Sequence, residues 1–183
     1  MKFDLKMILS TYNQLAIRVD EVRNTLGRPM TLTEKTIFSH LKIIEENTQN
    51  ISESIGIEIF PDHLALNDQT AQMVFLQHSL THQEDLSLST SVHLNPFAQT
   101  NDQLELILAK YSQKYGIGIW PQTSGILDQV ILEQYAFPGG LMIGSNAHIA
   151  NIGGLGTLAL EVGDGDSVCS MSGLTLKSAF PKI

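Results

Sequence analysis

From Ile55 onward, short apolar segments of the strand type alternate with amphipathic segments of the helix type. The clearest stretch predicts a strand over residues 116–120, a helix over 124–135 and a short buried strand over 141–143, followed by a glycine-rich loop over 144–156. Strands that alternate with helices are typical of a mostly parallel sheet with helices packed on its faces. The sequence therefore predicts an α/β domain with three layers.

The rest of this region predicts further elements of the same kind. Strands are expected over residues 55–59 and 91–93, and helices over 70–80, 102–115, 158–162 and 164–171. Asp164 is a candidate cap for the last helix, and Gly173 is a candidate stop signal.

The N-terminal part is helical in pattern. An apolar stripe with steps of three and four residues runs from Ile8 to Leu26 and predicts an amphipathic helix. Thr31 and Glu34 have the spacing of a capping box and open a second helix. We predict a helical arm over residues 1–50, with a polar loop at 45–54, packed on a domain over 51–183 so that both form one structural unit.

Composition and charge exclude several classes of partner. The net charge is −8, and the 11 Lys and Arg residues form no run, which argues against binding to nucleic acid or to an anionic membrane. No segment approaches the ~20 apolar residues of a membrane span. The N-terminus lacks the pattern of a secretory signal, so a cytoplasmic location is expected, with the mitochondrial matrix as an alternative.

Cys169 is the single cysteine of the chain. An iron–sulfur cluster needs several thiolates from its protein, and a structural zinc usually needs four ligands. The chain alone is therefore expected to hold no metal and no cofactor. Free cysteines are usually buried, so Cys169 is predicted to be a small, partly buried filler.

Five segments, taken together and in order, resemble motifs of the aconitase family. They are RPMTLTEKTIFSHL at 28–41, NDQTAQM at 67–73, VHLNPF at 92–97, YGIGIWPQTSGILDQVILEQY at 115–135 and NAHIANIGGLG at 146–156. The resemblance covers roughly residues 8–178, and it is to the first domain of the family. The resemblance implies the α/β fold of that domain. The enzymes of the family are hydro-lyases, and they hold a 4Fe–4S cluster through cysteines of later domains.

The resemblance places several altered residues at the family's catalytic positions. Where the family has an ion-paired aspartate and histidine for acid/base work, this sequence has Asn95 and Pro96, and proline carries no titratable group. A family histidine is replaced by Asp128. The family's aspartate beside a histidine becomes Asn146, while the histidine itself is kept as His148.

The positions implied in substrate binding are also partly altered. The family's glutamine at the head of its QDATAQM motif is Asn67 here, which is one methylene shorter, and Asn151 is kept. The resemblance thus implies His148 and Asp128 as the remaining catalytic candidates. It implies Asn67, Asn95, Asn146 and Asn151 as substrate-binding candidates.

Other candidates have simpler explanations. His78 and His82 have a metal-ligand spacing on one helix but no third ligand, so a solvated helix end is expected, and His93 is expected to be a structural strand residue. The turn at 153–156 is expected to serve architecture, with anion binding at its backbone amides as the alternative.

Three functions remain open. The first, which we favour, is a catalytically inactive aconitase-like domain that works through protein association, as an assembly subunit or a regulator. The second is one polypeptide of a split hydro-lyase. The third is a small cluster-free isomerase or decarboxylase acting on a di- or tricarboxylate. The expected partner is another protein chain that covers the face where the family's other domains pack, and a homo-oligomer is possible.

Overall fold

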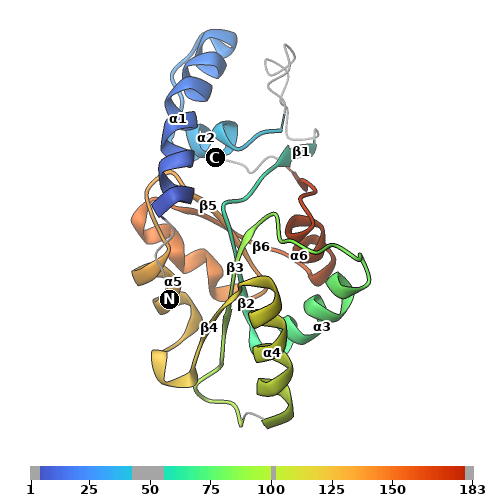
Figure 1. Cartoon of the computed structure of the whole chain (residues 1–183). Coiled ribbons are helices and arrows are strands. Elements are labelled where there is room, and N and C mark those ends of the chain that lie inside the picture. The colour runs from blue at the N-terminus through green and yellow to red at the C-terminus, as the bar shows by residue number, and fades with distance from the viewer. Residues whose placement is uncertain (1–4, 43–55, 100–101, 180–183) are drawn as a thin grey trace.

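A parallel five-stranded sheet forms the centre of the protein in a computed structural model, which describes residues 5–42, 56–99 and 102–179. Its strand order is β4-β3-β2-β5-β6, and every neighbouring pair is parallel (Figure 1). The strands are β2 (His63–Asn67), β3 (Ser89–His93), β4 (Gly118–Trp120), β5 (Leu141–Gly144) and β6 (Leu158–Glu161). Strands β2, β3 and β4 follow one another toward one edge of the sheet, whereas β5 and β6 lie on the other side of β2. The strand order therefore reverses between β2 and β5.

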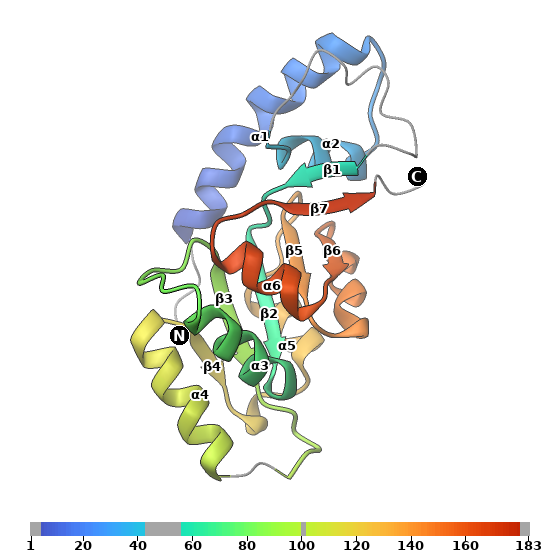
Figure 2. The same cartoon turned by 90° about the vertical axis from the view of Figure 1, so that its right-hand side faces the viewer.

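Helices cover both faces of this sheet, and Figures 1 and 2 show the resulting layers. One face carries α3 (Asp68–Ser79), α4 (Asp102–Tyr115) and α6 (Asp164–Met171). The other carries α5 (Leu127–Gln134) and the 3-10 helix η3 (Ala147–Leu155), and a 3-10 turn, η2 (Gln122–Ser124), precedes α5. The predicted three-layer α/β architecture is confirmed.

The two cores follow from the alternation of side chains along the strands. In β2, Leu64 and Leu66 face the core shared with α3, whereas Ala65 faces the core shared with α5. All three are fully buried. Strands buried on both faces are expected in a parallel sheet with helices on each side.

A small second sheet lies beside the first. Strand β1 (Gly56–Ile59) pairs antiparallel with β7 (Leu176–Ala179), with Ile59 opposite Leu176. The strand predicted over 55–59 is thus confirmed from Gly56 onward, but it belongs to this ribbon and not to the parallel sheet. Strand β7 was not predicted.

The N-terminal helices pack on one another and on the sheet. Helix α1 (Leu5–Leu26) follows the predicted stripe, and α2 (Leu32–Ser39) begins with the predicted capping box, in which Glu34 N donates to Thr31 Oγ1 and Thr31 N donates to Glu34. Val22 of α1 and Phe38 of α2 are buried in the same core as β2. The proposed division at residue 50 and the loop at 45–54 lie outside the described residues.

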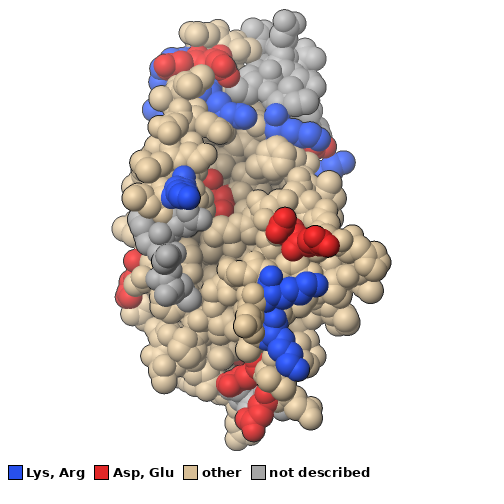
Figure 3. Space-filling view, viewed as in Figure 1, with Lys and Arg blue, Asp and Glu red and all other residues tan. Residues whose placement is uncertain are grey.

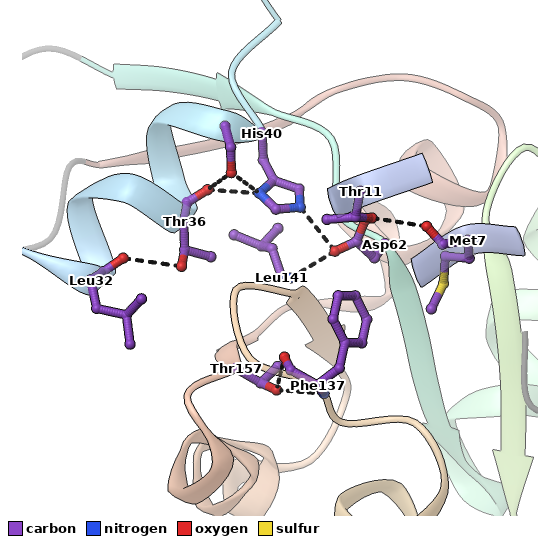
Figure 4. Close-up of polar contacts among 10 residues, drawn as sticks. Met7, Thr11, Leu32, Thr36, His40, Asp62, Phe137, Leu141 and Thr157 are labelled. Carbon is purple, nitrogen blue, oxygen red and sulfur yellow. Dashed lines mark hydrogen bonds and ion pairs between the residues drawn. The ribbon is translucent and has the colours of Figure 1, made fainter. Parts of the chain in front are cut away.

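A buried polar cluster connects these helices to the sheet (Figure 4). His40 Nδ1 lies 2.7 Å from the carbonyl oxygen of Thr36, and His40 Nε2 lies 2.9 Å from Asp62 Oδ2. Asp62 also accepts hydrogen bonds from Thr11 Oγ1 on α1 and from Leu141 N on β5. Since the carbonyl only accepts, the contact with Thr36 requires a proton on Nδ1.

Two predicted elements differ from the structure. The helix predicted over 158–162 is wrong, because Leu158 pairs with Leu141 and the segment forms the edge strand β6. Helix α6 begins at the expected residue, but its N-cap is Gly163 and no side chain caps it, so Asp164 is not the cap. The stop at Gly173 is confirmed by its positive φ of 80° just after the helix.

Two side chains have burial opposite to the prediction. Cys169 is exposed on α6 and is not a buried filler. His78 is fully buried and does not lie at a solvated helix end, because α4 packs over α3 and Tyr111 forms a 2.7 Å hydrogen bond with His78 Nδ1. Among the described residues no helix is long and apolar enough to span a bilayer.

Candidate functional site

A pocket of about 450 Å³ opens at the carboxyl ends of the central strands. Parallel α/β sheets bind ligands at this edge, beside the point where the strand order reverses. The segments that follow β2, β3, β4 and β5 all contribute to it. The residues that line it are Asn67, Asp68, Gln69, His93, Leu94, Asn95, Pro96, Phe97, Ile126, Leu127, Asp128, Asn146 and His148.

The structure brings together the residues selected from the sequence. Asn67, Asn95, Asp128, Asn146 and His148 all line this pocket. The sixth candidate, Asn151, lies beside it, where its Nδ2 donates to Asp128 Oδ2 at 3.1 Å. Their proximity supports a common site, while their individual roles stay predictions.

Asn67 is used by the fold itself. Its Oδ1 accepts hydrogen bonds from Thr70 N at 2.8 Å and from Thr70 Oγ1 at 3.0 Å, so it is the N-cap of α3. A short amide is well suited to this role, since asparagine is among the best N-cap residues. The carbonyl oxygen of this side chain is therefore directed to the helix terminus and not to the pocket.

Asp68 is a pocket residue that sequence reasoning missed. It is 3% exposed, and its carboxylate accepts hydrogen bonds from Gln69 N and, at 3.3 Å, from Asn95 N. The second contact connects the start of α3 to the segment after β3. Its position directly after the candidate Asn67, at the start of a predicted helix, was the available signal.

The His148–Asp128 pair does not form a direct hydrogen bond among the described contacts. Asp128, in the first turn of α5, is bonded to Asn151. His148 is exposed at the start of η3, where its backbone N donates to Asn146 Oδ1 at 2.9 Å. Asn146 thus caps η3 through its side-chain oxygen. This is the atom that the family resemblance would assign to orienting the imidazole of His148.

His93 is a strand residue, as predicted, and it also lines the pocket. It is 2% exposed at the end of β3, and its ring stacks on Trp120 with 6.2 Å between centroids. Its Nε2 lies 2.8 Å from Ser91 Oγ, whereas its Nδ1 is buried without a hydrogen-bond partner in the described structure. Burial, followed by the nearby His63, lowers the pKa of His93 to about 3, so its imidazole is neutral at physiological pH.

Acid is expected to destabilise the protein through His93. In the unfolded chain this histidine binds a proton near its ordinary pKa of 6.5, whereas the folded pKa is about 3. The contribution of neutral His93 to the free energy of unfolding is therefore fully present above pH 6.5 and is lost as the pH falls toward 3. At pH 5 the free energy of unfolding should be lower by about 2 kcal/mol. Urea unfolding at pH 7 and pH 5 measures the loss. His93→Gln should remove it, whereas the exposed His148→Gln should leave it unchanged, and an equal loss in all three proteins would contradict the assignment.

Gly144, at the end of β5, lies in a closely packed position. A Cβ atom there would lie 2.7 Å from Ile149 Cδ1 and 3.0 Å from the carbonyl oxygen of Ala65. We expect Gly144→Ala to lower the free energy of unfolding by about 1–3 kcal/mol through overpacking. Gly153→Ala is the matched control, because no atom lies within 4 Å of its added Cβ. Equal urea midpoints for the two variants would refute this explanation.

The glycine turn after η3 has a conformational requirement. Gly156 has a φ of 77° and caps the C-terminus of η3, and its N–H donates to the carbonyl of Gly153 at 3.0 Å. This left-handed conformation favours glycine and supports the architectural explanation of the turn. Anion binding at this turn stays a prediction.

The pocket lining of this chain contributes no thiol ligand for an iron–sulfur cluster. The lining residues offer carboxylates, amides and imidazoles but no thiol, and the ligands of such clusters are mainly cysteine thiolates. Within residues 5–42, 56–99 and 102–179, no group of three or more His, Cys, Asp or Glu could hold a metal ion.

The family follows from a match over most of the chain. The model of the family described as Aconitase family (aconitate hydratase) matches residues 39–183. The chain belongs to the aconitase family. The predicted resemblance is thus confirmed, and it covers the sheet, its helices and the pocket.

Several curated relatives are full-length members of this family. The mitochondrial aconitate hydratases of Emericella nidulans and Saccharomyces cerevisiae are 36% and 35% identical over 187 residues, which cover 94% of this chain and 24% of each relative. A probable mitochondrial aconitate hydratase of Caenorhabditis elegans is 34% identical over 197 residues, covering 100% of this chain and 25% of the relative. The chain spans about a quarter of the length of the curated relatives it matches.

Proposed function

We propose that this chain is a non-catalytic member of the aconitase family that acts through association with another protein chain. The proposal rests on the side chains found at the family's catalytic and substrate-binding positions in the pocket. Asn67 and Asn146 use their amide oxygens as helix caps, Asp128 is bonded to Asn151, and Pro96 offers no titratable group. General acid–base catalysis needs titratable groups that act together, and Asn67, Asn146 and Pro96 have none, while Asp128 and His148 form no direct hydrogen bond with each other among the described contacts.

The surface around the pocket supports association. Phe97 is 86% exposed and Ile126 is 40% exposed on the pocket lining. Figure 3 shows that one face of the protein has wide areas without charge, with charged side chains gathered over α4 and at the end formed by α1. Exposed apolar surface of this kind marks interaction sites.

Catalysis is the direct test of this proposal. The purified chain, incubated with ferrous iron and sulfide, should hydrate no aconitate above the protein-free background, alone or with a cluster-bearing partner chain. The full-length relative of Saccharomyces cerevisiae, treated in the same way, is the positive control. Turnover by the wild-type chain with such a partner would favour the split hydro-lyase instead. Turnover by the chain alone, abolished in His148→Ala, would favour the cluster-free enzyme.

Association is tested separately by mutating the exposed ring. Phe97→Asp should abolish binding of the partner, or self-association seen by sedimentation velocity if the partner is a second copy. Leu106→Asp is the matched control, because Leu106 is 55% exposed on α4, away from the pocket. A chain that stays monomeric and whose partner binds both variants equally would count against this surface.

The location of the chain is also a proposal. The curated relatives are named as mitochondrial proteins. Their names support the mitochondrial matrix as the alternative to the cytoplasmic location expected from the sequence. Microscopy of the tagged full-length chain distinguishes the two compartments.

A further inference from the structure

Helix α4 is attached to the rest of the molecule through a small part of its surface. Figure 2 shows it at the periphery, beside α3. Of its 14 residues only Leu108 and Ser112 are buried, while Tyr111 and Tyr115 are half-buried against α3. Elements with few buried contacts open locally at a lower free energy than the core of a fold. The contacts that these two tyrosines make therefore have a large share in keeping α4 docked.

The polar centre of this junction is His78, in the last turn of α3. Its side chain is fully buried, and its Nδ1 lies 2.7 Å from Tyr111 Oη. Its ring also meets Tyr115 at an angle of 84°, with 5.3 Å between the ring centroids. Its Nε2 is buried without a hydrogen-bond partner in the part of the chain that the structure describes. One ring of α3 thus contacts both tyrosines that hold α4.

A neutral imidazole fits this junction better than an imidazolium. A neutral ring has one donor and one acceptor nitrogen, and the Tyr111 hydroxyl can complement Nδ1 in either role. A second proton places N–H groups on both nitrogens, so Nε2 becomes a charged donor without a described acceptor. Burying a charge without a partner costs far more than burying an unpaired neutral nitrogen. Protonation of His78 therefore disfavours the docked form.

The central strands present no titratable side chain to α3. His63 of β2 stacks on Tyr135 and His93 of β3 stacks on Trp120, on the opposite face of the sheet. Because side chains alternate along a strand, the intervening residues face α3. These residues are Leu64, Leu66, Thr90 and Val92.

The carboxylates of the neighbouring helices lie at the other end of the junction. Helices α3, α4 and α6 run in the same direction, because each follows a strand of the parallel sheet. The acidic residues of α4 and α6 are in their first turns, whereas His78 is in the last turn of α3. The titratable groups of α6 and of the segment after α3 that are exposed make no described contact with His78. They are Cys169, His82, Glu84 and Asp85.

Burial and the charge of Lys114 act on His78 in the same direction. Burial, followed by Lys114, lowers the pKa of His78 below its ordinary value of 6.5. Burial, followed by a hydrogen bond with Tyr115, raises the pKa of Tyr111, so its phenol stays uncharged and supplies no counter-ion. Once α4 moves away, water reaches His78 and the ordinary pKa returns. The open form then binds a proton more readily, so the preference for the docked form is fully present above pH 6.5 and is lost as the pH falls below it.

We propose that His78 is an acid-sensitive latch: when its ring takes up a proton, α4 detaches from α3 while the central sheet stays folded. The inference goes beyond the proposed function, because it involves neither the pocket nor the surface around Phe97. It stands or fails independently of aconitate turnover.

Hydrogen exchange of the full chain at pH 7 and pH 5, with rates corrected for the intrinsic effect of pH, tests the latch. The protection of the α4 amides should fall several-fold between the two pH values, with a limit of about 25-fold for a histidine of ordinary pKa that is never protonated when docked. The amides of β5, an inner strand of the sheet, should stay better protected than those of α4 at both pH values. Unchanged protection of α4, or equal protection of α4 and β5 at pH 5, would overturn the proposal.

A pair of histidine variants assigns the effect to one ring. His78→Gln removes the titrating group and keeps a polar side chain, so its α4 amides should be equally protected at the two pH values. His148→Gln removes an exposed imidazole and should keep the fall seen in the wild-type chain. A fall that persists in His78→Gln would show that another group drives the opening.

A second measurement needs no substitution, in case His78→Gln does not fold. The ring ¹⁵N resonances of His78 in the wild-type chain are followed as the pH is lowered from 7.5. Their half-point should lie below the ordinary value of 6.5. A half-point at or above that value, or protonation of His78 with no change in the protection of α4, would refute the latch.

Discussion

Asp62→Ala should lower the free energy of unfolding by about 3–5 kcal/mol, as expected when one partner of a buried ion pair is removed. The side chains of His40 and Asp62 are 6% and 11% exposed. Without the carboxylate, His40 Nε2 loses its partner, Leu141 N loses its acceptor, and Thr11 Oγ1 keeps only the carbonyl of Met7. Three separate segments of the chain are released by this one change.

Urea unfolding monitored by circular dichroism measures this loss, and Asp20→Ala is its control. Asp20 is also ion-paired, with Arg23, but both side chains are largely exposed, at 67% and 49%. Exposed pairs contribute about 0–1 kcal/mol, so the control should be close to wild type. Equal midpoints for the two variants would mean that the buried cluster adds nothing to stability.

Phe75→Ala should have an effect of similar size, a loss of about 3–5 kcal/mol from the transfer of the ring and the cavity it leaves. Phe75 is 1% exposed on α3, and its ring stacks on Tyr111 of α4 at 4.3 Å with an interplanar angle of 10°. Tyr111 in turn forms a hydrogen bond with the buried His78. The change therefore loosens the packing of α4 on α3.

The control for this variant is Phe97→Ala, which removes the same ring from a site that is 86% exposed. Its free energy of unfolding should stay within about 0.5 kcal/mol of wild type, as is usual for surface substitutions. The comparison uses the difference between the two urea midpoints. A small effect at Phe75 together with a large one at Phe97 would contradict the described packing.

Elements with strong local signals were predictable from the sequence. The stripe from Ile8 to Leu26 and the capping box of Thr31 and Glu34 depend on residues within one or two turns, and the structure reproduces both. The α/β class is identified from the alternation of many strand-type and helix-type segments along the chain. The class was therefore predictable even where single elements were missed.

Strands β2 and β6 were not predictable in this way. The segment HLALN of β2 is five residues long and is buried on both faces, so it shows no alternation of polar and apolar residues. The LALE segment of β6 favours a helix locally, and its pairing with β5 overrides that preference. Both outcomes are set by neighbours distant in the chain.

The site was predictable in position but not in its hydrogen bonds. The family resemblance selected five residues that line one pocket. That the Asn67 oxygen caps α3, and that Asp128 bonds Asn151 and not His148, depends on side-chain orientation. The contact between Asp128 and Asn151 forms only after α5 and η3 are assembled, so no motif encodes it, whereas the cap of α3 by Asn67 is a local pattern that sequence reasoning could have found.

The antiparallel ribbon of β1 and β7 has a kinetic consequence. Thr175 Oγ1 donates to Glu58 Oε2 across 117 positions of the chain, and closing so long a loop is entropically unfavourable. The ribbon should therefore assemble after the rate-limiting step of folding, when the parallel sheet is already in place. Weakening it should accelerate denaturation and leave the refolding rate almost unaltered, so the ribbon would govern how long the native state persists.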